Sequence, residues 1–78
     1  MVSGMLWFDN DPKTGLSSKI QRAVQYYQKK YGQTPSFCEI HPKMVEKETP
    51  ENSGLKIETS DQILLHHFWI GTTQEKST

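Results

Sequence analysis

Two aromatic pairs near the ends of the chain, Trp7-Phe8 and Phe68-Trp69, place the strongest constraint on its fold. Each pair lies in a short apolar run of the kind that forms a β-strand. Because side chains alternate between the two faces of a strand, each pair directs one large ring to each side of a sheet. The chain has one segment with a clear helical pattern, and one helix covers one side. Aromatic side chains on the other side are therefore expected to face solvent or a partner.

The length of 78 residues predicts one small domain over 1–78, with an ordered core at about 5–71. Only 33% of the residues are hydrophobic, so the core of a lone chain is marginal. Cys38 is the only cysteine and cannot form a disulfide within one chain. Metal binding and self-association are the remaining ways to stabilise so small a core, and self-association is favoured. The lone thiol and the lack of a secretory or membrane-spanning pattern favour a cytoplasmic location and no membrane partner.

The helical pattern runs to Tyr31, and Gly32 follows it as a residue suited to ending a helix. Thr14 or Ser17 is expected to cap the start through a side-chain oxygen. The apolar positions recur with the 3.6-residue period of a helix. They are Leu16, Ile20, Ala23, Val24, Tyr27 and Tyr31.

Four segments have strand patterns: 5–8, 36–41, 54–59 and 65–70. Pro42 is expected to open a short helical turn, the charged loop 46–53 to be mobile, and the tail 74–78 to fray. The order β-α-β-β-β predicts an α+β fold, with the single helix packed on one face of a four-stranded mixed or antiparallel sheet. The last two strands are close enough along the chain to pair antiparallel.

Alternation along the strands assigns the side chains to two faces, although a slip of one residue would exchange part of the assignment. The face expected to meet the helix carries Leu6, Phe8, Cys38, Ile40, Leu55, Ile57, Phe68 and Ile70. The opposite face is expected to carry Met5, Trp7, Phe37, Glu39, His41, Lys56, Glu58, His67 and Trp69.

Large rings among polar groups on this opposite face have three interpretations. The face pairs with a protein, including a second copy of the chain, or it stacks unpaired bases of a single-stranded nucleic acid. Alternatively, the loop 46–53 and the tail fold over it. For a binding face, the expected anchors are Trp7, Phe37 and Trp69, with His41 and His67 as polar partners.

The helix exterior carries a second candidate surface, a basic patch with a tyrosine in its middle. Nine basic and nine acidic residues give a formal net charge of zero, which argues against strong non-specific attraction to nucleic acid. The alternative interpretation is the solvated face of an amphipathic helix. The patch consists of Lys19, Arg22, Tyr26, Lys29 and Lys30.

Two groups of residues are candidate sites of chemistry. The first group has side chains of the kind that coordinate zinc: Cys38, His41, His66 and His67. Because neighbouring residues of a strand point to opposite faces, these side chains are not expected to converge on one metal ion. A catalytic thiol is not expected either. The run from Met5 to Asp11 resembles the opening of small ferredoxin-like nucleases of bacterial adaptive immunity, although a second full helix is missing. That resemblance implies a magnesium-dependent nuclease using Asp9 and Asp11. The same residues also form an ordinary polar turn.

The segments Lys30–Pro35 and His67–Gly71 are similar to small bacterial proteins without an assigned activity. No glycine-rich phosphate loop or nucleophile–base arrangement is present, so neither an enzyme nor a cofactor is expected. The sequence favours a non-enzymatic protein-interaction module that associates with itself through the aromatic-polar face. Single-stranded nucleic-acid binding by that face and the basic patch is the first alternative, and the nuclease is the second.

Overall fold

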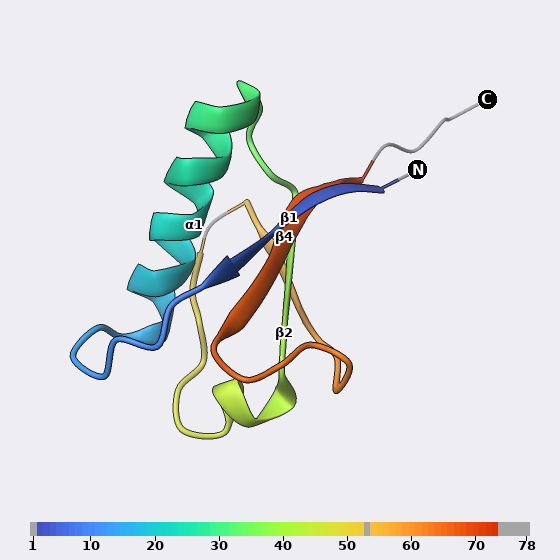
Figure 1. Cartoon of the computed structure of the whole chain (residues 1–78). Helices are drawn as coiled ribbons and strands as arrows, with labels where there is room; N and C mark the ends of the chain where they lie inside the picture. Colours follow the sequence, from blue (N-terminus) through green and yellow to red (C-terminus); the bar gives the residue numbers. More distant parts are fainter. Residues whose placement is uncertain (1, 53, 74–78) are drawn as a thin grey trace.

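The computed structural model describes residues 2–52 and 54–73 and has the predicted α+β fold. In these ranges one α-helix, α1 (Leu16–Tyr31), packs against one face of a four-stranded mixed sheet (Figure 1). The strands are β1 (Val2–Phe8), β2 (Phe37–Ile40), β3 (Lys56–Thr59) and β4 (His67–Thr73). A short 3-10 helix, η1 (Pro42–Val45), follows β2 where Pro42 predicted a helical turn. The predicted tail 74–78 lies outside the described residues.

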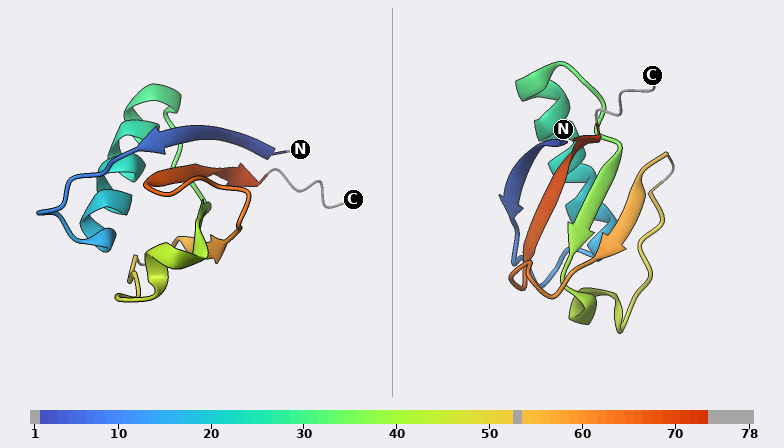
Figure 2. Two further views of the ribbon diagram at one scale, coloured as in Figure 1. Left: turned by 60° about the horizontal axis from the view of Figure 1, so that its bottom comes forward. Right: turned by 90° about the vertical axis from the view of Figure 1, so that its right-hand side faces the viewer.

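The strand order in the sheet is β1-β4-β2-β3 (Figure 2). β4 pairs antiparallel with both β1 and β2, whereas β2 and β3 are parallel. The expected antiparallel pairing of the last two strands is therefore wrong, because β4 inserts between β1 and β2. The placement has a physical reason: Phe68 and Ile70 of β4 are fully buried and need a central position. β3 carries Lys56 and Glu58, and charged side chains suit an edge strand.

The helix ends as its sequence predicts but begins differently. Gly32 adopts the left-handed conformation with φ 69°, and its N–H donates to the Gln28 carbonyl at 2.8 Å. At the start, Gly15 is the N-cap residue and offers no side chain. Glu48 accepts the Leu16 N–H through Oε1 at 2.9 Å instead. A carboxylate at this position also interacts favourably with the helix dipole.

Thr14 and Ser17 do not cap α1, so that prediction is wrong. The Ser17 hydroxyl accepts the Glu51 N–H at 2.9 Å, and the Ser17 carbonyl accepts from Asn52 Nδ2 at 3.2 Å. These contacts and the Glu48 cap hold the segment 46–52 against the first turn of the helix. The loop therefore does not lie over the face of the sheet opposite α1. Its mobility stays a prediction.

The core lies between α1 and one face of the sheet. It contains the predicted residues of β2 and β4, and Leu55 and Ile57 pack against it. In β1 the predicted assignment is reversed: Met5 and Trp7 point toward the helix, whereas Leu6 and Phe8 lie on the other face. The core cluster consists of Met5, Leu16, Ile20, Ala23, Tyr27, Cys38, Ile40, Phe68 and Ile70.

Candidate interaction surface

The side of the sheet away from α1 is here called the open face. In the right-hand view of Figure 2 the strands lie in front of α1, and no described helix or loop covers the middle of the sheet. The open face is built from the strand positions that alternate with the core positions. They include Gly4, Leu6 and Phe8 of β1, Phe37 and Glu39 of β2, Lys56 and Glu58 of β3, and His67, Trp69 and Gly71 of β4.

Trp69 lies flat enough on this face to cover Gly4. A Cβ atom added to Gly4 would be 2.7 Å from Cζ2 of the Trp69 ring, which is closer than carbon atoms approach. The absence of a side chain at this position therefore makes room for the indole. Leu6 is directly opposite Trp69 in the pairing of β1 with β4 and remains 56% exposed. The indole is half-buried and has exposed apolar surface beside it.

Phe8 and His67 form the next pair along β1 and β4. Their ring centroids are 4.9 Å apart, and Phe8 is still 54% exposed. The His67 ring is oriented by a contact of 3.0 Å between its Nδ1 and the Leu65 carbonyl. Leu64 and Leu65, in the loop that leads into β4, are also exposed. We call Leu6, Phe8, His67 and Trp69 the apolar patch.

The five anchors predicted from the sequence do not all lie on this face. His67 and Trp69 belong to the apolar patch, and Phe37 is on the open face but only 7% exposed. Trp7 lies on the helix side, where its ring contacts Tyr26 with centroids 5.1 Å apart. His41 caps η1, with its Nδ1 accepting the Lys43 N–H at 3.1 Å.

The surface residues that the sequence missed are Leu6, Phe8, Leu64 and Leu65. Met5-Leu6-Trp7-Phe8 is apolar at every position, so alternation alone does not say which pair is exposed. One signal was present in Gly4, because a glycine inside a strand often marks the close approach of another group. Gly4 shares its face with Leu6 and Phe8.

Two of the five residues of the predicted basic patch are buried or paired with carboxylates and are not available to a ligand. Lys19 is only 7% exposed, with its side chain among the buried residues of α1. Arg22 pairs with two carboxylates of the turn after β1. Tyr26, Lys29 and Lys30 remain and line a surface hollow of about 350 Å³. This hollow lies on α1, on the opposite side of the sheet from the apolar patch.

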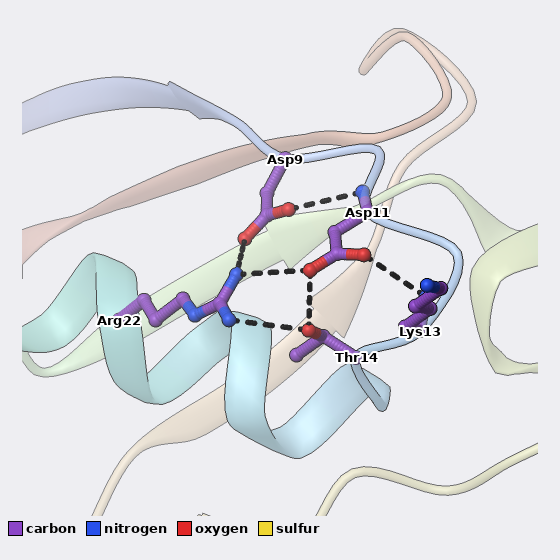
Figure 3. A network of polar contacts seen from close by, with 5 residues as sticks. All are labelled: Asp9, Asp11, Lys13, Thr14 and Arg22. Atoms are coloured by element: carbon purple, nitrogen blue, oxygen red, sulfur yellow. Dashed lines mark hydrogen bonds and ion pairs between the residues drawn. The ribbon is translucent and has the colours of Figure 1, made fainter.

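Asp9 and Asp11 are engaged within their own turn (Figure 3). Asp9 accepts the Asp11 N–H through Oδ1 at 3.1 Å and the Arg22 guanidinium through Oδ2 at 3.2 Å. Asp11 accepts the Thr14 hydroxyl at 2.6 Å and the Lys13 N–H at 3.0 Å. The Thr14 hydroxyl, the Lys13 N–H and Arg22 together lower the pKa of Asp11 below its ordinary value. Each carboxylate oxygen thus has a protein donor, as expected for a structural turn.

The sulfur and imidazole groups are dispersed. Cys38 is fully buried in the core, and this burial, with the Glu39 charge as a smaller cause, raises its pKa to about 12. His66 is exposed, and its φ of 67° allows the chain to turn into β4. Within residues 2–52 and 54–73, no group of three or more His, Cys, Asp or Glu side chains is arranged to hold a metal ion.

No protein-family model, curated protein or solved structure matches the chain. That result agrees with the resemblance to proteins without an assigned activity. A proposal about function therefore has to be based on the geometry of the chain itself. Among the described residues, no helix has the length and apolar character needed to cross a membrane.

Proposed function

We propose that the protein is a non-enzymatic interaction module that associates with itself through the apolar patch on the open face. The observation that carries this proposal is the exposure of Leu6 and Phe8, at 56% and 54%, beside the half-buried Trp69. Contiguous apolar surface of this kind is typical of protein-binding sites. Aromatic side chains are also enriched at the centres of such sites.

The contacts favour a protein partner over a single-stranded nucleic acid. Stacking of bases needs accessible rings close to positive charge, but Phe37 is almost fully buried. The cations Lys29 and Lys30 lie on α1, behind the sheet, and Arg22 is paired with Asp9. The open face itself carries Glu39 and Glu58 as well as Lys56. A second copy of the chain, whose patch is equally apolar, is the partner that this surface fits best.

Sedimentation equilibrium of the wild-type protein over about 1 μM to about 1 mM tests the proposal. The mass is expected to rise from 9.0 kDa toward twice that value, with little dependence on salt. Phe8→Ala is expected to weaken the association by about tenfold or more, as loss of a central aromatic does. Tyr31→Ala is the matched control, because it removes a ring of similar exposure from the helix.

Two results would contradict the proposal. A mass of 9.0 kDa at every concentration would mean that the patch does not bind a second copy. Equal effects of Phe8→Ala and Tyr31→Ala would mean that association occurs elsewhere. Fluorescence anisotropy of a labelled single-stranded oligonucleotide tests the alternative: affinity that falls steeply with added salt would favour nucleic-acid binding instead.

A further inference from the structure

β1 is an edge strand of the described sheet, with a strand on one side only. The Asp9 N–H donates to the His66 carbonyl at 3.0 Å, which fixes the direction of the backbone groups along β1. Every second residue of an antiparallel strand directs its backbone groups to the same side. Trp7 and Met5, two and four residues before Asp9, therefore direct their N–H and C=O groups toward β4. Gly4, Leu6 and Phe8 direct theirs away from the sheet. They form a row of backbone donors and acceptors able to pair with another strand.

The two edges of the sheet differ in how they resist such pairing. β3, at the far edge, has four residues and includes Lys56 and Glu58, and short charged edges discourage intermolecular pairing. β1 has seven residues, Val2–Phe8, with no charged residue and no proline. The two outer strands are both visible in the right-hand view of Figure 2. Of these two edges, β1 is the one that combines length, neutrality and an adjacent apolar patch.

We propose that two copies of the chain pair antiparallel through their β1 edges and form one continuous sheet. This inference rests on the proposed self-association and places the contact at the β1 border of the apolar patch, where Leu6 and Phe8 lie, instead of over the whole open face. β1 suits its own copy because an uncharged strand brings no like charges together when it pairs with itself. A two-fold axis relates the copies, so the contact closes as a dimer and does not propagate into a fibre.

Full overlap of the seven-residue strand places the two-fold axis at Met5. Gly4 then lies opposite Leu6 of the second copy, and Val2 lies opposite its Phe8. Both pairs join residues whose backbone groups point outward, as a hydrogen-bonded antiparallel pair requires. Leu6 and Phe8, which are both more than half exposed in one chain, thereby lie beside the new seam, where Leu6 of the second copy is the diagonal neighbour of Leu6. The two open faces join into one wider apolar surface.

Hydrogen exchange of the wild-type protein, followed by NMR at several concentrations, tests this pairing directly. At the lowest concentration, the amide hydrogens of Gly4, Leu6 and Phe8 are expected to exchange fast because they face solvent. Above the dimer dissociation constant their exchange is expected to slow by about tenfold or more. The amide hydrogens of Met5 and Trp7 serve as internal controls, since they are bonded to β4 in both states.

A pair of variants at one position separates edge pairing from contact between open faces. Leu6→Pro exchanges the leucine side chain for the proline ring and removes an N–H that points away from the sheet, a substitution that edge strands accept. Leu6→Ala also removes most of the leucine side chain but keeps the N–H. Leu6→Pro is expected to remain monomeric throughout the range, whereas Leu6→Ala still dimerises, though more weakly. Circular dichroism checks that both variants are folded.

The outcomes distinguish this inference from the proposed function. A dimer whose Gly4, Leu6 and Phe8 amide hydrogens stay unprotected would overturn edge pairing and leave association through the open face intact. Slow exchange of these hydrogens in a monomeric sample would mean that the chain itself covers the edge, and would also overturn the inference. A monomer at every concentration, with fast exchange, would overturn both proposals.

Discussion

Gly4 and Trp69 determine how the aromatic surface is arranged at the scale of single residues. The indole rests where a side chain at Gly4 would otherwise stand, since a Cβ atom there would come within 2.7 Å of Cζ2. Its neighbour Leu6 is left exposed on the same strand. A small residue in β1 thus sets the position of the largest ring of the open face.

Gly4→Ala is accordingly expected to reduce the free energy of unfolding by about 1–3 kcal/mol, the usual cost of forcing an extra carbon into a packed site. Denaturation with urea measures the change. The matched control repeats the substitution in a Trp69→Leu background, where the clash with the indole is removed and the 3.1 Å approach to the Ile70 carbonyl oxygen is the contact that remains, so a smaller loss is expected. The same loss in both backgrounds would show that the indole does not occupy this space.

At the scale of elements, the sequence predicts the faces of a strand where a polar residue marks the outward side, as Glu39 does in β2 and His67 does in β4. Glu39 stands between Cys38 and Ile40, so the inward positions of β2 were predicted correctly. β1 has no such residue from Met5 to Phe8, and its faces were predicted in reverse. Packing decides the matter there, because Trp7 reaches Tyr26 on the helix while Gly4 makes room for Trp69.

The cap of α1 could not be predicted because its acceptor lies far along the chain. Local patterns offered Thr14 and Ser17, but Glu48, 32 residues beyond Leu16, supplies the oxygen. Glu48→Ala is therefore expected to lower the free energy of unfolding by about 0.5–2 kcal/mol, as loss of a helix cap does. Thermal and urea denaturation measure it. Glu46→Ala, in the same loop, is the control and should change stability by less than about 0.5 kcal/mol.

At the scale of the whole molecule, the sequence predicts the elements and their order along the chain but not their order in the sheet. Adjacent strand patterns suggested that the last two strands pair, whereas seven residues, 60–66, connect β3 at one edge to β4 in the interior. Composition held a clue: the run Phe68-Trp69-Ile70 is more apolar than the alternating Lys56-Ile57-Glu58. A strand with fully buried side chains belongs in the centre of the sheet, and a strand with charged side chains belongs at an edge.

This arrangement predicts an order of local stability across the sheet. From Trp69 to Gly71, β4 is bonded on both sides, and its residues Phe68 and Ile70 are in the core, so the amide hydrogens of 68–71 are expected to exchange only through global unfolding. β3 is a four-residue edge strand without a fully buried side chain, so its amide hydrogens should exchange through smaller openings. Their exchange is expected to be at least about tenfold faster than in β4, which corresponds to an opening free energy lower by about 1.4 kcal/mol or more. Residue-resolved hydrogen exchange at a concentration where the chain is monomeric measures both. Exchange in β3 as slow as in β4 would contradict the strand order, because only a central strand can match the protection of one bonded on both edges.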